Sequence, residues 1–295
     1  MIYTIGETVL DIIFKNRVAQ TSKAGGSALN TSVSLVNLGS EVSFVTEIGN
    51  DEAGAFIIDF LKKYNVDISK TIIYPNRKTS LALAYLNEKN DAKYEFFKDL
   101  PDSVEPRNID FEENDILLYS SSYALQKRTR KFFLSLIKNA QEKNVIRMYD
   151  PNMRKKLDKG SDEFKYLFEN VGYAHIIRAS DEDCQNIFGT TDSDKVYAEL
   201  QKIGVTIFIY TQSSKYVKLY TPNLTKQYEV KKIKPISTIG AGDTFNAGVI
   251  HCIRNAGVVV ENLSVLPTEF WDKTIQFAIS CSAEVCESYN NYVLR

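Results

Sequence analysis

The sequence predicts an α/β fold in which a doubly wound, mainly parallel sheet is covered by helices on both faces. Short apolar runs alternate along the chain with segments of helical periodicity, a pattern typical of βαβ units. Of the 295 residues, 44% are hydrophobic, so the chain can build a sizeable core. The length allows one large domain or two, and no stretch rich in Pro, Gly or Ser divides it. We therefore expect a single domain over residues 1–295.

The strands expected in this sheet are short runs of apolar residues. They cover residues 2–6, 42–49, 115–120, 145–150, 175–180 and 206–210. Helical spacing of apolar residues is clearest in the segments 28–38 and 130–141. Because doubly wound sheets bind their ligands at the carboxyl ends of the strands, we expect functional residues at that edge.

Residues 71–100 interrupt this alternation. Two extended segments, TSLALAYL and AKYEFF, flank the turn-like NEKND with no helical pattern between them, which favours a β-hairpin. A hairpin does not easily join a parallel sheet, so we expect this one to form, with residues 10–22, a small β-lid over the site. The alternative is a surface flap without a role. Leu81, Leu83 and Tyr85 give the hairpin an apolar face that a second subunit could cover, which favours a homodimer through the lid.

Charge and composition exclude several classes of protein. With 36 Lys and Arg against 37 Asp and Glu, the chain lacks the cationic excess with which nucleic-acid binders neutralise phosphates. No run approaches the roughly 18 apolar residues of a membrane helix, and the N-terminal segment lacks the basic start of a signal peptide. The four Cys and two His match no zinc-ligand spacing. We expect a cytoplasmic protein without nucleic-acid or membrane partners.

The most informative segment is STIGAGDTFNAGVI, residues 237–250. Apolar residues at helical spacing indicate a helix that begins just after Gly242, so the turn of Gly240, Ala241 and Gly242 would place backbone N–H groups at the positive helix end. Such a turn is a cradle for an anion. The adjacent Asp243 carboxylate is costly there unless it takes up a proton, as a base does when it deprotonates a hydroxyl before attack on phosphorus. The alternative is that Asp243 caps the helix.

A second glycine motif stands near the N-terminus. In GGSALNTSVSLVNLG, residues 25–39, two glycines precede an amphipathic helix with Asn30 in its first turn. Together the two motifs resemble the signature regions of the PfkB carbohydrate kinases, the ribokinase-like family, which carry G-G-x-x-x-N and then D-T-x-G-A-G-D. Residues 47–67, 79–97 and 150–157 resemble further family segments, and the last two look closest to the fructokinase branch. The resemblance spans nearly the whole chain and implies the ribokinase-like fold, a doubly wound sheet with a β-lid.

The resemblance assigns roles to individual residues. It implies that Asp243 is the base that takes the proton from a sugar hydroxyl, and that the anion hole for the transferring phosphoryl group consists of Gly240, Ala241 and Gly242. The residues that would contact the sugar are Asp11, Gly25, Gly26, Asn30 and, at the sugar or phosphate edge, Arg154. Short polar groups and bare backbone suit a ligand rich in hydroxyls. The alternative for Arg154 is an exposed arginine at a helix start.

The resemblance also implies ATP as the phosphoryl donor, with Mg²⁺. The nucleotide would contact Ser180, Asp183, Thr211, Ser213, Gly240 and Gly242. Asp183 lies in the segment that matches the family's N-x-x-E and would act on the metal indirectly, because Mg²⁺ keeps several of its waters. The expected activity is transfer of the γ-phosphoryl group to a primary hydroxyl of a monosaccharide. Fructose is the expected sugar, with ribose or 2-keto-3-deoxygluconate as alternatives.

Three positions depart from the family pattern. Ser237 stands where the family has an Asp associated with a monovalent-cation site, so we expect activity nearly indifferent to K⁺. Ser213 and Tyr216 replace two glycines beside the nucleotide, where their side chains could crowd it. A sugar-binding homologue with impaired catalysis is therefore an alternative. A dinucleotide-dependent dehydrogenase is a weaker one, because no G-x-G-x-x-G follows the first strand.

Overall fold

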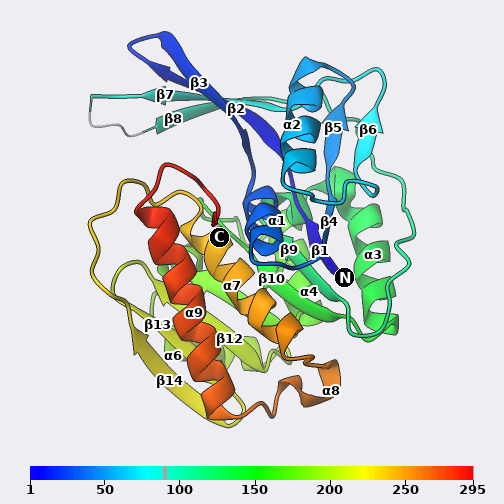
Figure 1. Cartoon of the computed structure of the whole chain (residues 1–295). Helices are drawn as coiled ribbons and strands as arrows, with labels where there is room; N and C mark the ends of the chain where they lie inside the picture. Colours follow the sequence, from blue (N-terminus) through cyan, green and yellow to red (C-terminus); the bar gives the residue numbers. More distant parts are fainter. Residues whose placement is uncertain (89–91, 295) are drawn as a thin grey trace.

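The structure, a computed structural model, describes residues 1–88 and 92–294. Across these residues, an eight-stranded central sheet has the order β14-β13-β12-β11-β10-β9-β1-β4 (Figure 1). Its parallel strands are β1 (Ile2–Ile5), β4 (Val42–Val45), β9 (Ile116–Ser120), β10 (Ile146–Asp150), β11 (Ile176–Ser180) and β12 (Ile207–Gln212). Antiparallel pairing then adds β13 (Tyr216–Thr221) and β14 (Leu224–Glu229) at one edge. The expected doubly wound, mainly parallel sheet is confirmed.

Residues 42–49 do not form the single strand that their apolar pattern predicts. The first strand ends at Val45, and β5 (Glu47–Gly49) pairs instead with β6 (Ile72–Tyr74) in a separate two-stranded sheet. The chain passes from one sheet to the other at Thr46. The carbonyl oxygen of this residue accepts a 2.8 Å hydrogen bond from the N–H of Ile72 in β6. Both sides of the break are buried, so hydrophobicity alone does not reveal it. The other expected strands form at the expected positions.

Helices cover both faces of the central sheet (Figure 1). One face packs against α3 (Arg130–Glu142), α4 (Asp162–Tyr173), α5 (Asp181–Phe188) and α6 (Ser193–Gln201). The other packs against α1 (Ser27–Asn37), α7 (Ala241–Asn255) and α9 (Thr268–Cys286). Other connections contain α2 (Glu52–Lys63), α8 (Val260–Leu263) and the 3₁₀ turns Ser122–Leu125 and Lys127–Thr129. Within the described ranges, no helix has the length and apolar character to cross a membrane.

A four-stranded sheet projects from the main body (Figure 1) and has the order β3-β2-β7-β8. Its strands are β2 (Val9–Lys15), β3 (Val18–Gly25), β7 (Leu81–Leu86) and β8 (Ala92–Phe97). The β7–β8 pair is the expected antiparallel hairpin, and β2 joins it in parallel with β7. Of the expected turn NEKND, residues 89–91 lie outside the described residues. The register places Lys23, Asp11, Ala82 and Phe96 in one row across the sheet, so their side chains share a face.

Candidate active site

The start of α7 forms the floor of the candidate site. Gly240 has a φ of 85°, and a Cβ atom there would lie 2.2 Å from the carbonyl oxygen of Asn291, so only glycine fits the turn. The helix begins at Ala241, and Gly242 follows in its first turn. The carbonyl oxygen of Ala241 accepts a 2.7 Å hydrogen bond from the Ser282 hydroxyl, which ties the turn to α9. The positive end of α7 is thus held rigidly where an anion could bind.

Asp243 lies in the first turn of α7 with only 8% of its surface exposed. Its Oδ1 accepts a 2.6 Å hydrogen bond from the Ser27 hydroxyl, and its Oδ2 accepts a 2.8 Å bond from Nδ2 of Asn30. Burial raises the pKa of Asp243 to about 6, while these two hydrogen bonds oppose the rise. The helix cap is Gly240 and no side chain caps it, so the alternative in which Asp243 caps the helix is wrong. Its carboxylate is therefore available to accept a proton from a ligand.

The glycine pair before α1 brings the predicted sugar residues together. Gly26 is the N-cap of α1, which places Asn30 in the first turn beside Asp243. A Cβ atom at Gly25 would lie 1.9 Å from Oδ2 of Asp11, so the Asp11 carboxylate rests against bare backbone. Burial raises the pKa of Asp11 to about 6, opposed by the charges of Arg154 and Lys23. Glycine at this position leaves room for a carboxylate at the base of the four-stranded sheet.

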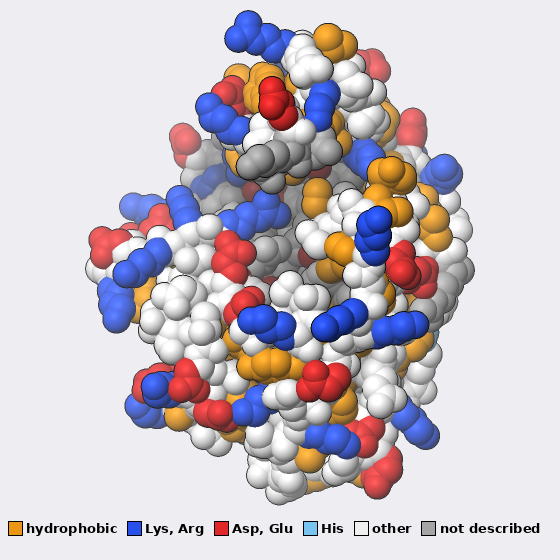
Figure 2. Space-filling view, turned by 90° about the vertical axis from the view of Figure 1, so that its left-hand side faces the viewer, with side chains coloured by type: hydrophobic (Ala, Val, Ile, Leu, Met, Phe, Trp, Pro, Cys, Tyr) orange, Lys and Arg blue, Asp and Glu red, His pale blue; other side chains and the backbone are white. Residues whose placement is uncertain are grey.

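Arg154 lies in the loop that follows β10 and is exposed. It is outside any helix, so the alternative of a helix-start arginine is wrong in that respect. Its charge acts on the carboxylate of Asp11 and on the hydroxyl of Tyr94 in β8, which places it on the side of the site that Asp11 occupies. Figure 2 shows this side of the molecule hollowed between the four-stranded sheet above and the main body below, with Lys and Arg side chains along the rim.

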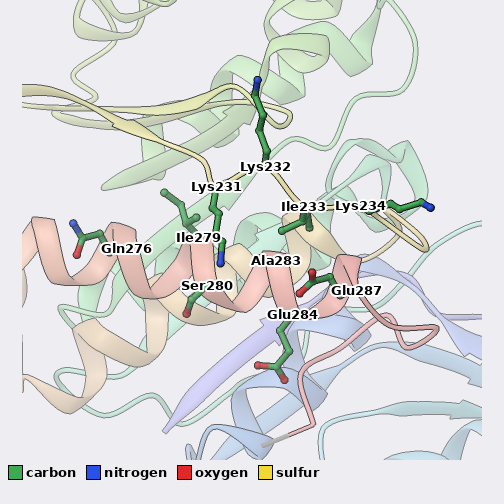
Figure 3. Close-up of a pocket in the computed structure, with 10 residues that line it drawn as sticks. All are labelled: Lys231, Lys232, Ile233, Lys234, Gln276, Ile279, Ser280, Ala283, Glu284 and Glu287. Atoms are coloured by element: carbon green, nitrogen blue, oxygen red, sulfur yellow. The ribbon is translucent and has the colours of Figure 1, made fainter.

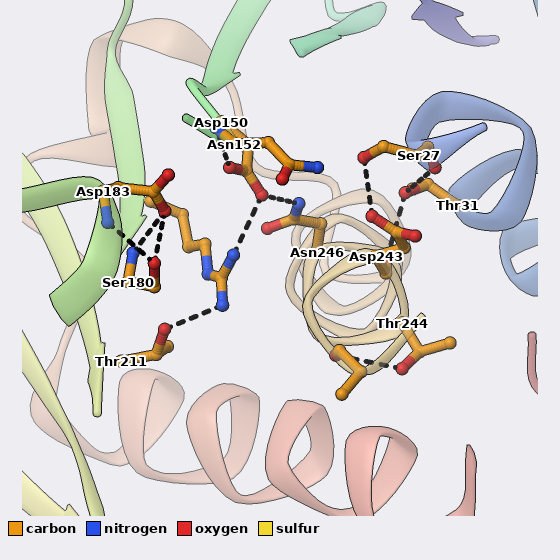
Figure 4. A network of polar contacts seen from close by, with 12 residues as sticks. Ser27, Thr31, Asp150, Asn152, Ser180, Asp183, Thr211, Asp243, Thr244 and Asn246 are labelled. Carbon is orange, nitrogen blue, oxygen red and sulfur yellow. Dashed lines mark hydrogen bonds and ion pairs between the residues drawn. The ribbon is translucent and has the colours of Figure 1, made fainter. Parts of the chain in front are cut away.

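A buried polar network at the carboxyl ends of β10, β11 and β12 contains residues that the sequence did not single out (Figure 4). Oδ2 of Asp150 accepts hydrogen bonds from Nη1 of Arg178 at 3.1 Å and from Nδ2 of Asn246 at 2.6 Å. The second guanidinium nitrogen, Nη2, donates to the Thr211 hydroxyl at 2.7 Å. The signal that could have found Asp150 and Arg178 is a charged residue at or near the end of a buried apolar strand, where parallel sheets bind ligands. Ser27 was missed because its role depends on α7, far along the chain.

Ser180 and Asp183 lie at the start of α5 and form a capping box. Oδ2 of Asp183 accepts from the Ser180 N–H at 2.8 Å and from the Ser180 hydroxyl at 2.6 Å, while Oδ1 accepts from the N–H of Met153. The carboxylate therefore orders the loop after β10 as well as its own helix. Among residues 1–88 and 92–294, no three His, Cys, Asp or Glu side chains are grouped so that they could hold a metal ion. A role of Asp183 toward a metal would act through water.

The hairpin turn after β12 carries the two residues that replace family glycines. Ser213 has a φ of 44°, the left-handed conformation that glycine adopts without strain. Tyr216 begins β13, and its ring lies 6.0 Å from the ring of Tyr210, packed against the core beneath α5 and α6. Thr211, near the end of β12, accepts a hydrogen bond from Arg178, and Ser213 comes directly after that strand. The two predicted nucleotide residues therefore lie at the same end of β12.

A groove beside the anion turn lies between α9 and the loop that follows β14 (Figure 3). It has a volume of about 790 Å³. Its residues are Lys231, Lys232, Ile233 and Lys234 on the loop, and Gln276, Ile279, Ser280, Ala283, Glu284 and Glu287 on α9. The Ile236 N–H donates to the Cys286 carbonyl oxygen at 2.7 Å, which fixes the loop to the end of α9 just before the Gly240 turn. The groove is therefore a neighbour of the α7 N-terminus.

The chain is similar to known proteins in sequence and in fold. The model of the pfkB family carbohydrate kinases matches residues 1–293. The chain is 27% identical over 272 residues to a probable chloroplastic fructokinase-6 of Arabidopsis thaliana, covering 88% of this chain and 68% of that one.

Two solved structures have the same fold. The fructokinase of Vibrio cholerae O395, with fructose, ADP and calcium bound, gives a TM-score of 0.84 at 21% identity and covers 98% of this chain and 94% of that one. The ATP-bound fructokinase of Xylella fastidiosa also gives 0.84, at 20% identity, and covers 98% and 93%. The match over nearly its full length shows that this chain belongs to the PfkB family of carbohydrate kinases. Its fold is ribokinase-like, as the two sequence motifs predicted.

Proposed function

We propose that this kinase is a fructokinase that transfers the γ-phosphoryl group of ATP to a primary hydroxyl of fructose. The observation that carries the proposal is the Asp243 carboxylate, buried at the positive end of α7 and held by Ser27 and Asn30. The Arabidopsis thaliana relative is a probable fructokinase, and the Vibrio cholerae fructokinase structure contains fructose and ADP. The buried Asp243 carboxylate with its two hydrogen bonds argues against the alternative of a sugar-binding homologue with impaired catalysis.

Asp243 is suited to act as the base. A pKa of about 6 leaves its carboxylate mostly ionised at pH 7 and more basic than an ordinary Asp. In the reaction, the sugar hydroxyl gives its proton to Asp243 and its oxygen forms a bond to the γ-phosphorus. The bond from that phosphorus to the bridging oxygen breaks, and ADP leaves. The N-terminus of α7 at Gly240, Ala241 and Gly242 stabilises the charge on the transferring group.

The nucleotide is proposed to lie across the end of the central sheet. Its phosphates would meet the Gly240 turn and the Thr211 side of the network, and its base would enter the groove between α9 and the loop 231–234. The side chains fit a magnesium ion held mainly by phosphate oxygens and water, because Asp150 and Asp183 bring two carboxylates near each other at the strand ends. Bound there, Mg²⁺ would neutralise phosphate charge, with Asp183 acting through metal-bound water.

The sugar is proposed to bind between α1 and the four-stranded sheet. Asp11 and Asn30 would accept and donate hydrogen bonds to hydroxyls, while Gly25 and Gly26 leave space for the ring and Arg154 covers the outer edge. The aromatic side chains of Tyr94 and Phe96 lie on the face of the sheet that carries Asp11. The sheet would act as a lid whose closure excludes water from the phosphoryl group.

A coupled ADP-release assay tests the proposal with fructose, ribose, 2-keto-3-deoxygluconate, fructose 6-phosphate and nucleosides at matched concentrations. We expect the highest kcat/KM with fructose and ADP release that depends on the sugar. A higher value with ribose or 2-keto-3-deoxygluconate would contradict fructose as the substrate and leave the kinase assignment in place. Absence of sugar-dependent ADP release with every compound would favour the impaired homologue.

We also propose a cytoplasmic homodimer that forms through the four-stranded sheet. Leu81, Leu83 and Tyr85 lie on the face opposite Asp11, and Leu83 is paired with Ile12 of β2 across that face. Sedimentation velocity tests the proposal. We expect a dimer that Leu83→Glu converts to a monomer, whereas Val265→Glu, a substitution at an exposed apolar residue on the main body, leaves the dimer unchanged. A monomeric wild-type protein at micromolar concentration would contradict it.

A further inference from the structure

The guanidinium of Arg178 joins Asp150 and Thr211 in the network at the strand ends. The side chain belongs to β11 and is 11% exposed. Nη1 donates to Asp150 at 3.1 Å and Nη2 donates to Thr211 at 2.7 Å. Its Nε is buried and has no hydrogen-bond partner in the described residues. A buried guanidinium N–H without a partner is costly, which indicates that a ligand acceptor is missing.

Arg178 also lies directly against the anion turn. A Cβ atom at Gly242 would be 2.8 Å from Nη1 and 3.3 Å from Nη2, so the guanidinium lies beside the backbone of the first turn of α7. Its central carbon lies 5.9 Å from the ring centroid of Phe245 in the same helix. The charge of Arg178 acts on the carboxylates of both Asp150 and Asp243. A phosphoryl group that enters between the guanidinium and the positive end of α7 would meet positive charge on both sides.

We propose that Arg178 is a catalytic residue that binds the transferring phosphoryl group opposite the N-terminus of α7. This inference rests on the proposed phosphoryl transfer. As the bond to the leaving oxygen of ADP breaks and the bond to the sugar oxygen forms, charge on the equatorial phosphoryl oxygens is stabilised by the planar N–H groups of Arg178. The proton of the sugar hydroxyl goes to Asp243. Asp150 and Thr211 hold the guanidinium in place before the substrate arrives.

A purely structural role makes different predictions. Arg178 could instead only tie β10 to β12 through Asp150 and Thr211, and its loss would then lower stability without a selective effect on chemistry. Arg147→Met offers a comparison, because it removes another buried arginine of the sheet, one that donates from β10 to the Tyr173 carbonyl oxygen at 2.6 Å. If Arg178 acts on the phosphoryl group, Arg147→Met should have a small effect on kcat and removal of the Arg178 guanidinium a large one.

The test compares Arg178→Ala, Arg178→Met, Arg147→Met and Arg254→Ala, the last at the opposite end of α7. Steady-state kinetics with the sugar preferred by the wild type should show kcat lowered by at least 100-fold in both Arg178 variants, since a phosphate-binding arginine typically contributes a factor of about 10³ or more. The KM for the sugar should stay within threefold. Millimolar guanidinium chloride should restore at least tenfold activity to Arg178→Ala. Arg147→Met and Arg254→Ala should stay within a few-fold of the wild type.

A binding measurement keeps the two proposals distinguishable. ADP with aluminium fluoride, an analogue of the transferring phosphoryl group, should bind the wild type more tightly than ADP alone, and this gain should disappear in Arg178→Met. A folded Arg178→Met with wild-type kcat, or with an undiminished fluoride-dependent gain, would overturn the inference. A loss of kcat that guanidinium does not restore and that Arg147→Met reproduces would also overturn it. Absence of turnover in the wild type would contradict the proposed function instead, and the fluoride-dependent gain would then decide the role of Arg178.

Discussion

The two carboxylates of the site, Asp243 on the central body and Asp11 on the four-stranded sheet, have the same raised pKa in different surroundings. Burial raises both pKa values to about 6. Asp243 accepts two short hydrogen bonds from Ser27 and Asn30. For Asp11, the charges of Arg154 and Lys23 alone oppose the rise of the pKa. The contrast indicates a division of work: Asp243 is held in one orientation for proton transfer, whereas Asp11 keeps its oxygens available for ligand hydroxyls.

Substitution of Asp243 should have the largest effect. Asp243→Asn keeps the shape of the side chain and removes the base, so we expect kcat to fall by roughly two to four powers of ten while sugar binding is retained. Steady-state kinetics and calorimetric titration with the sugar measure the two quantities. Asp272→Asn, at a surface ion pair with Lys226, is the matched control. Near wild-type turnover in Asp243→Asn would remove Asp243 from the chemistry.

Asp11 should act on sugar binding alone. Asp11→Ala removes a hydroxyl acceptor, worth about 1 to 3 kcal/mol if buried, so the KM for the sugar should rise roughly 5- to 150-fold with little change in the KM for ATP. Asn30→Ala should in addition lower kcat, because Asn30 also orients Asp243. Equal increases in both KM values for Asp11→Ala would move Asp11 out of the sugar pocket.

The pH dependence of kcat/KM should reveal the titration of both carboxylates. Each must be ionised to work, and each has a pKa of about 6, so kcat/KM for the sugar should fall as the pH drops below about 6, with a logarithmic slope approaching about 2. Asp11→Asn removes one titration and should reduce the slope to about 1. Measurement from pH 4.5 to pH 8 in a constant-ionic-strength buffer would show this, and an unchanged slope in the variant would mean that Asp11 does not titrate in this range.

Substitution of Ser237 should have a smaller effect, seen in how activity depends on K⁺. Ser237 replaces a family carboxylate, its hydroxyl accepts from the Ile239 N–H at 3.2 Å, and we expect the wild type to respond nearly equally to KCl and NaCl at fixed ionic strength. Ser237→Asp should introduce or strengthen a preference for K⁺. Strong potassium activation of the wild type would contradict the interpretation of this departure.

The smallest expected effect is at Ser213. Its left-handed backbone costs a non-glycine residue about 1 kcal/mol, part of which glycine loses again through its greater freedom in the unfolded chain. Ser213→Gly should therefore raise the free energy of unfolding by about 0.5 kcal/mol and lower the KM for ATP slightly. Urea denaturation and ATP titration check the two results. A higher KM for ATP would show that the Ser213 side chain assists the nucleotide.

The central body was more predictable from sequence than the interactions within its site. Buried strands and amphipathic helices follow from local apolar periodicity, and the glycine turns at 25–26 and 240–242 follow from motifs. The network of Asp150, Arg178 and Asn246 joins residues up to 96 positions apart, and no local pattern records such a pairing. The break at Thr46 was missed for a related reason, because the strands on its two sides, β4 and β5, are both fully buried.

Single-turnover phosphoryl transfer, measured by rapid quench with both substrates saturating, tests the division of work most directly. Saturation removes differences in binding, so only the chemical step remains. We expect Asp11→Ala to transfer phosphate at nearly the wild-type rate, and Asp243→Asn to be slower by at least a factor of about 100. Equal slowing of the two variants, or a wild-type rate in Asp243→Asn, would contradict the assignment of proton transfer to Asp243 and of sugar recognition to Asp11.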